Sequence, residues 1–116
     1  MSSMARAATT ADVFNAVAEP RRREILDLVG GGELSVGDIV DALGLAQPQV
    51  SKHLRVLRTV GALDVRGEGR RRFYRVNPEA LRPIRDWLSH YEQLWSERFA
   101  ALDAVLAELN EKEEPR

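Results

Sequence analysis

The sequence predicts a mainly α-helical domain with one β-hairpin, in the order α-α-α-α-β-β-α, ending in a long helix. Apolar residues recur every three or four positions over most of the chain, and this period changes to two between Leu63 and Val76. The chain has 116 residues, of which 44% are hydrophobic and 30% charged, as in one globular domain. We expect that domain at residues 9–110, with a disordered arm at 1–8 and a frayed tail at 111–116.

The residue types exclude several kinds of protein. The absence of cysteine excludes disulfides, thiolate metal sites and thiol redox chemistry. No apolar run approaches the roughly 20 residues that cross a bilayer, and no secretory segment is recognisable, so we expect a cytoplasmic protein without membrane contact. No nucleophile elbow, phosphate loop or metal-ligand set occurs, so we expect neither an enzyme nor a cofactor.

Caps and proline mark the first two helices. Thr9 with Asp12 three residues later predicts an N-cap pair for a helix over 10–19, whose apolar residues are Val13, Phe14 and Val17. Pro20 suits the first turn of a second helix, which the glycine run 30–32 ends. Its inward residues are Ile25, Leu28 and Val29.

The next two helices form a tight pair over residues 35–60. Ser35 with Asp38 predicts a second capping pair, for a two-turn helix that ends at Gly44. Pro48 opens the following helix, which Gly61 closes. The inward residues are Val36, Ile39, Val40 and Leu43 in the first helix and Val50, Leu54 and Leu57 in the second. This arrangement is typical of a helix-turn-helix.

Residues 63–76 alternate as a hairpin does, with the polar stretch 67–70 as its turn. The hairpin would then be the wing of a winged helix-turn-helix. Asn77 and Pro78 predict a new helical turn, and Pro83 interrupts it, so we expect a long helix over 84–110.

Positive charge is concentrated in the segment from Pro48 to Arg75. The whole chain has a net charge of -1, but this segment carries +6 and the remainder -7. A cationic block on an acidic protein indicates a polyanion partner. Its eight basic residues, against Asp64 and Glu68, are Lys52, Arg55, Arg58, Arg66, Arg70, Arg71, Arg72 and Arg75.

The outward face of the fourth helix has the residue types that contact double-stranded DNA. With Val50, Leu54 and Leu57 inward, helical geometry turns Pro48, Lys52, Arg55, Val56 and Thr59 outward. Gln pairs with adenine and Arg with guanine in the major groove. The expected contacts are Gln47, Gln49, Ser51, Lys52, His53 and Arg55 in this helix and Arg70, Arg71 and Arg72 in the wing. A second arginine triplet, Arg21 to Arg23, either lies near DNA or pairs with Glu19, Glu24 or Asp27.

Three segments resemble the ArsR/SmtB family of bacterial winged-helix repressors. They are Glu33 to Ile39, Gln47 to Leu57 with its Ser-x-His-Leu core, and Gly61 to Leu63 leading into the arginine-rich hairpin. The resemblance extends from Val13 through the last helix. It implies a homodimer joined by its first and last helices, which binds an imperfect inverted repeat and releases it when an effector binds.

The sequence departs from the metal-binding members of this family. Where those members carry Cys-x-Cys, this chain has Ser35 and Gly37. In the last helix Asp86 and His90 lie one turn apart without a second histidine, which is a poor zinc site. We therefore expect no metal.

The last helix carries an apolar band too broad for one small core. Trp87, Tyr91, Trp95 and Phe99 recur every four residues. The expected dimer interface consists of Val13, Phe14, Val17, Trp87, Leu88, Tyr91, Trp95, Phe99, Leu102, Val105 and Leu106. As alternatives, the aromatic side chains bind an apolar effector, or the winged helix binds another protein instead of DNA.

Overall fold

The computed structural model describes residues 12–113, and its element order agrees with the predicted fold class. The elements are α2 (Val13–Ala18), α3 (Pro20–Gly30), β1 (Leu34–Ser35), α4 (Val36–Leu43), α5 (Gln47–Thr59), β2 (Leu63–Glu68), β3 (Arg71–Val76), η1 (Pro78–Leu81) and α6 (Arg82–Glu113). They form two compact units, one ending at Pro83 and the other beginning at Ile84.

Helix α2 is capped by Asp12 and not by the expected residue. The Asp12 carboxylate accepts a hydrogen bond of 2.8 Å from the Asn15 amide, which satisfies one free N–H of the first turn. The expected cap at Thr9 and the expected arm at 1–8 lie outside the described residues. Helix α3 begins at Pro20 and ends at Gly30 as predicted, with Gly31 as its C-cap.

Helices α4 and α5 confirm the predicted tight pair. The Ser35 hydroxyl accepts from the Asp38 amide while the Asp38 carboxylate accepts from the Ser35 amide, which completes the capping box. Gly44 ends α4 at a φ of +67°, a left-handed conformation that glycine adopts without steric cost. Two further residues then lead to α5, where Pro48 lies in the first turn.

The hairpin is part of a three-stranded antiparallel sheet with strand order β1-β3-β2. Strand β1 has only two residues, too few for a period of two to reveal it, and the sequence did not predict it. The turn is also shorter than predicted: Glu68 pairs with Arg71, which leaves only Gly69 and Arg70 between the strands. Gly69 has a φ of +64°, as the first central residue of a two-residue hairpin turn of type II′ requires.

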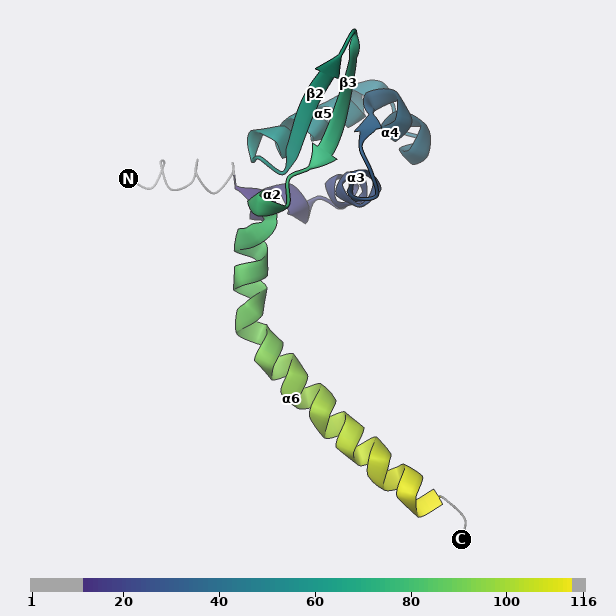
Figure 1. Ribbon diagram of the computed structural model, residues 1–116, viewed down its shortest axis with the longest axis vertical. Helices are drawn as coiled ribbons and strands as arrows, with labels where there is room; N and C mark the ends of the chain where they lie inside the picture. Colours follow the sequence, from purple (N-terminus) through teal and green to yellow (C-terminus); the bar gives the residue numbers. More distant parts are fainter. Residues whose placement is uncertain (1–11, 114–116) are drawn as a thin grey trace, which may run out of the picture. The chain divides into compact units, whose positions relative to one another are not determined.

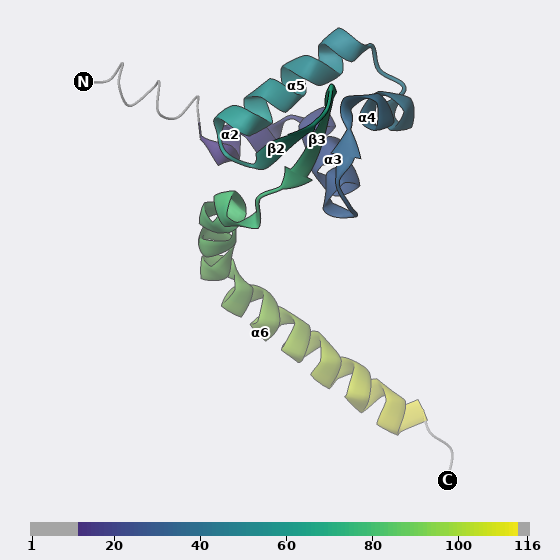
Figure 2. The same ribbon diagram turned by 45° about the horizontal axis from the view of Figure 1, so that its top comes forward.

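The core of the first unit lies between the helices and one face of the sheet. Figures 1 and 2 show α5 running beside the hairpin, with α4 at the start of α5. Tyr74 and Leu63 extend from the sheet into a buried cluster that otherwise comes mainly from the helices. Its other buried members are Ala16, Ile25, Val29, Ile39, Val50, Leu54, Leu57 and Ala62.

The second unit consists of α6, which extends further than the sequence predicted. The expected tail at 111–116 is helical up to Glu113, and its last three residues lie outside the described part. Glu111, Lys112 and Glu113 are good helix formers, and the first breaker in the sequence is Pro115. Pro83 lies in the first turn of α6, where its missing N–H costs nothing. No helix among the described residues is long and apolar enough to span a membrane.

Candidate nucleic-acid interface

The exposed side of α5 carries most of the polar residues that the sequence assigned to DNA. Gln47, Gln49, Lys52 and Arg55 are exposed, and Ser51 is partly buried. Lys52 and Arg55 lie opposite the three buried apolar side chains of the same helix, and Gln49 and Ser51 flank them, so burial of one face fixes the direction of the other. Val56 was expected outside but is partly buried and packs on the core, because it lies beside the buried Leu57 at the edge of the apolar face.

His53 lies toward α3 instead of along the exposed face. Its Nδ1 atom is 3.5 Å from a guanidinium nitrogen of Arg22, and the ring is partly buried. Burial and the charge of Arg22 hold the pKa of His53 below its ordinary value of 6.5, against the opposing carboxylate of Glu19. The geometry therefore makes His53 part of the contact between α5 and the first helices.

Two residues of the triplet Arg21 to Arg23 have a structural role that the sequence did not predict. Arg22 Nε donates to the Ala16 carbonyl at 2.6 Å, and Arg23 donates to the Val17 carbonyl at 2.8 Å. These carbonyls belong to the last turn of α2, where cations are favourable and carbonyls need donors. Arg21 instead pairs with Glu24 at 3.1 Å, one of the partners that the sequence offered.

The hairpin arginines divide into two groups according to their acidic partners. Arg66 contacts Glu33 and Glu68, each at 2.8 Å, and Arg75 lies 4.0 Å from Asp64. The hydrogen bonds from Arg66 lower the pKa of Glu33, and those carboxylates raise the pKa of Arg66. Arg66 is therefore held between two acidic partners, whereas Arg75 has one exposed acidic neighbour at a longer distance.

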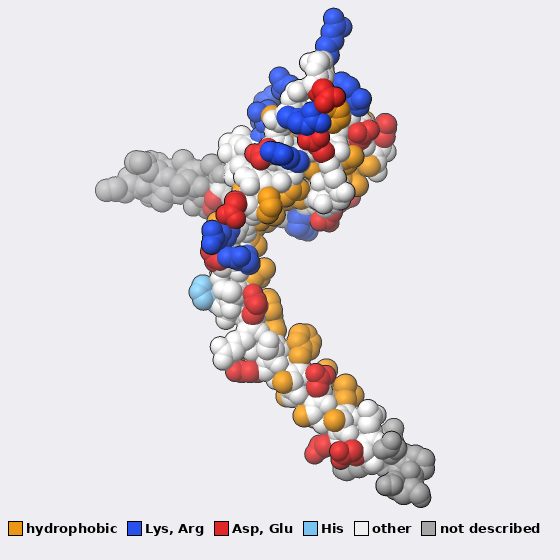
Figure 3. Space-filling model, in the orientation of Figure 1, with side chains coloured by type: hydrophobic (Ala, Val, Ile, Leu, Met, Phe, Trp, Pro, Cys, Tyr) orange, Lys and Arg blue, Asp and Glu red, His pale blue; other side chains and the backbone are white. Residues whose placement is uncertain are grey.

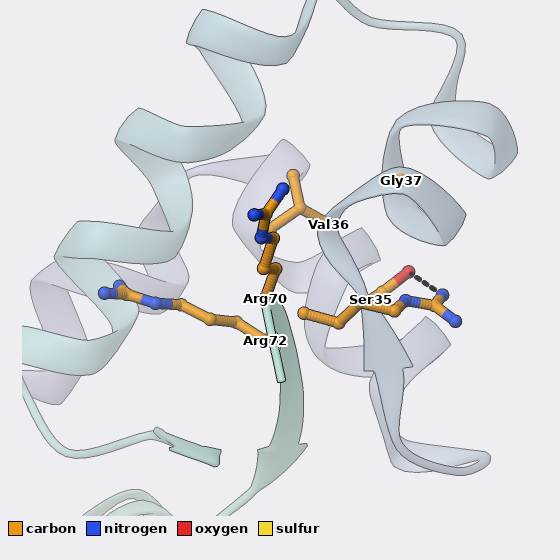
Figure 4. A pocket seen from close by; sticks show the side chains of 6 residues that line it. Ser35, Val36, Gly37, Arg70 and Arg72 are labelled. Carbon is orange, nitrogen blue, oxygen red and sulfur yellow. Dashed lines mark hydrogen bonds between the residues drawn. The ribbon is translucent and has the colours of Figure 1, made fainter. Parts of the chain in front are cut away.

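The wing triplet Arg70 to Arg72 forms no ion pair with the described side chains of residues 12–111, but its members diverge. Arg71 stacks on Phe73 at 5.0 Å and donates a long hydrogen bond of 3.5 Å to the Ser35 hydroxyl. Figure 4 shows Arg72 extending toward α5 and Arg70 lying at the start of β3, beside Val36. The triplet, Ser35, Val36 and Gly37 line a hollow of about 380 Å³.

On the face that Figure 3 shows, Lys and Arg side chains lie over the part that holds α5 and the hairpin, with Asp and Glu side chains between some of them, and a basic side chain projects at the tip. Two elements that are adjacent in space thus present cations together. Such a surface can bind a polyanion through its backbone phosphates and read bases through the polar side chains of α5.

The positions considered for a metal are engaged in other contacts. The Ser35 hydroxyl caps α4, and Gly37 offers no side chain. Asp86 pairs with Arg85 at 3.1 Å, and His90 Nδ1 lies 3.2 Å from the Trp87 carbonyl. Within the part of the chain that the structure describes, no group of three or more His, Cys, Asp or Glu side chains is placed to hold a metal ion.

The apolar band of α6 retains large exposed side chains. Tyr91 is 43% exposed and Phe99 65%, and the ring of Tyr91 contacts Trp87 and Trp95 at centroid distances of 5.6 and 6.2 Å. In α2, Phe14 is exposed, Val17 is partly buried and Val13 is buried within its own chain. The other exposed members of the band are Trp87, Leu94, Trp95, Leu102, Val105, Leu106 and Leu109, whereas Leu88 is partly buried.

The helix pair followed by a basic hairpin defines a winged helix-turn-helix protein. Residues 19–64 match the sequence model of a protein family, the bacterial regulatory proteins of the arsR family. The chain is 31% identical to the transcriptional repressor SdpR of Bacillus subtilis over 80 residues. This alignment covers 69% of this chain and 89% of SdpR. The chain therefore belongs to the arsR family, and it is a transcriptional regulator, not an enzyme.

Solved structures of the family share the fold. An ArsR-like transcriptional regulator from Rhodococcus superposes with a TM-score of 0.64 at 27% identity, over 87% of this chain and 95% of that one. A possible ArsR-family regulator from Mycobacterium bovis has a TM-score of 0.60 at 30% identity, over 77% and 85%. That protein is described as a homodimeric winged helix-turn-helix DNA-binding domain. The predicted fold class is confirmed.

The lowered pKa of His53 predicts that the protein loses stability as the pH falls below about 6.5. In the unfolded chain the imidazole takes up a proton near its ordinary pKa, whereas the folded chain keeps it neutral to lower pH, so protons favour unfolding. We expect the free energy of unfolding in urea to decrease from pH 7.5 to 5.5, and to decrease less in His53→Gln. The same pH dependence in both proteins would contradict the prediction.

Proposed function

We propose that this regulator is a homodimeric repressor of transcription that binds an inverted-repeat operator in double-stranded DNA and uses no metal. Gln47, Gln49 and Lys52 of α5 read bases in the major groove, with Arg55 and Ser51 beside them. Arg70, Arg71 and Arg72 of the hairpin hold the sugar-phosphate backbone. Because its target is chromosomal DNA, we place it in the cytoplasm. His53 positions α5 and is left out of the contact set.

One observation carries this proposal: the exposed polar face of α5 lies beside hairpin arginines that form no ion pair with the described side chains. Unpaired cations on neighbouring elements favour a polyanion, and amide side chains near the N-terminal end of a helix favour base reading. Membership of a family of transcriptional regulators supports the same conclusion.

The exposed band of α6 supports a homodimer. Nine large apolar side chains of α6 are between 43% and 65% exposed, which is a costly surface for a protein in water. A second copy of the same helix offers a matching apolar surface, and the related M. bovis domain is homodimeric. The proposed interface comprises Phe14 and Val17 of α2 with the α6 band.

The surroundings of Ser35 support metal independence. Its hydroxyl accepts from the Asp38 amide at 3.2 Å and from the Arg71 guanidinium at 3.5 Å, so its lone pairs face donors. A nearby guanidinium also repels a divalent cation. The hollow at the start of α4 is thus unsuited to a cation.

If α5 reads bases, substitution of its polar side chains should weaken DNA binding by an amount that depends on the DNA sequence. With an operator selected from random duplexes by the wild-type protein, Gln49→Ala should weaken binding by about 1–3 kcal/mol, and much less on unrelated DNA. The matched control is Gln93→Ala in α6, which should change neither affinity. Fluorescence anisotropy measures the affinity for each duplex. If Gln49→Ala loses the same affinity for operator and for unrelated DNA, Gln49 reads no base.

Dimerisation through α6 predicts that one charge on the apolar band dissociates the protein. Leu102→Glu should yield monomer at micromolar concentration in sedimentation equilibrium, because the dimer would bury two carboxylates against apolar surface. Ala100→Glu adds the same charge at an exposed position on the opposite side of α6 and should remain dimeric. A wild-type protein with the mass of one chain under these conditions would refute the dimer.

Metal independence predicts that zinc, cadmium, arsenite and mild oxidants leave operator affinity unchanged. The chain has no thiolate, and the two positions of the family's cysteine pair hold Ser35 and Gly37. Release of the operator at stoichiometric metal, measured by anisotropy, would overturn this part of the proposal. It would direct attention to Asp86, His90 and Glu97.

A further inference from the structure

A second hollow lies between α5 and strand β3, apart from the base-reading positions near the start of α5. Its volume is about 200 Å³, enough for a tetrahedral oxyanion with a few waters, since water in the liquid occupies about 30 Å³. Three arginines and a serine are among the residues that line it. We call it the arginine pocket, and its lining residues are Ser51, Leu54, Arg55, Arg58, Arg72 and Tyr74.

The positions of these residues follow from the two secondary structures. Ser51, Arg55 and Arg58 are spaced by four and three residues, so they lie on one side of α5. Arg72 lies two residues before Tyr74 and shares its face of β3, and Figure 4 shows its side chain extending toward α5. The helix and the strand are held together by the buried Leu54 and Tyr74, so the three arginines are presented on a fixed base.

The electrostatics of the pocket are unbalanced. No ion pair with a described side chain is formed by Arg55 or Arg58 of α5 or by Arg72 of β3. In contrast, Arg66 and Arg75 of the hairpin each have an acidic partner. Three like charges around one hollow repel each other, and an anion would relieve that repulsion. Guanidinium groups offer paired N–H donors that match the oxygens of a phosphate.

We propose that the arginine pocket binds one phosphate group of the DNA backbone, held by Arg55, Arg58 and Arg72 with the Ser51 hydroxyl as a further donor. This inference rests on the proposed function and refines it. It adds Arg58 to the interface and makes Arg55 a phosphate ligand instead of a base reader. The backbone is the source of the phosphate because the pocket lies between the two elements that bind the duplex.

The test uses Arg58→Gln in the full chain, with Arg75→Gln as the matched control. Both remove one exposed arginine, but Arg75 lies outside the pocket, 4.0 Å from Asp64. In Arg58→Gln the phosphate in each half of the dimer loses one of its three guanidinium ligands, so the slope of log K against log salt should flatten by up to about 1.8, equally on operator and random duplex. Arg75→Gln should keep the wild-type slope, and Arg58→Lys should restore part of it.

A second measurement locates the phosphate. Neutral methylphosphonates, substituted one position at a time in each half-site, should include one position that weakens binding by the wild-type protein more than binding by Arg58→Gln. If the wild-type protein binds its operator while Arg58→Gln keeps the wild-type slope, the pocket assignment is wrong and the proposed function stands. If the wild-type protein binds no duplex, the proposed function itself fails.

A third measurement separates backbone phosphate from a free anion. Inorganic phosphate at constant ionic strength should shift the arginine Nε–H NMR signals of the free protein only weakly and without saturation. Saturation at low millimolar phosphate, together with a wild-type salt slope for Arg58→Gln, would overturn the assignment to DNA. The pocket would then be a site for a phosphate-bearing small molecule.

Discussion

The burial of one face of α5 is the constraint on which the rest of the site depends. Val50, Leu54 and Leu57 are almost completely buried against a core that includes Tyr74 of the hairpin. Because a helix is rigid about its axis, fixing these side chains also fixes the polar face opposite them and the arginines at its side. The same contact places the hairpin beside α5, so one apolar interface orients both elements that carry the positive charge.

Acidic partners distinguish the roles of the arginines more clearly than their positions in the sequence do. Arg66 is held between Glu33 and Glu68, so it stabilises the hairpin and has little charge left for a ligand. Arg22 and Arg23 satisfy the carbonyls at the end of α2. Among the described residues, the arginines without such partners gather around α5 and the wing, with the exception of Arg98 in α6. In a protein of net charge -1, this division creates a local cationic surface.

Arg22 also connects parts of the molecule that have different proposed tasks. It donates to the Ala16 carbonyl of α2 and lies 3.5 Å from the His53 ring of α5. A side chain that joins a helix of the proposed dimer interface to the proposed recognition helix resists their relative displacement. Protonation of the His53 ring would place a second cation beside Arg22. The charge of Arg22 therefore favours the neutral form of His53.

The sequence alone determined the caps, the helix-turn-helix, the hairpin and the inward residues of α5, because these depend on local periodicity and on turn residues such as Gly44 and Gly61. It also located the cationic segment. Only the tertiary structure decided which cations remain without acidic partners, how the wing triplet diverges, and that His53 faces Arg22. It also revealed β1, a two-residue strand that exists only by pairing with β3. These features depend on contacts between residues as many as 40 positions apart, such as the pairing of Leu34 with Tyr74, and no local pattern encodes such contacts.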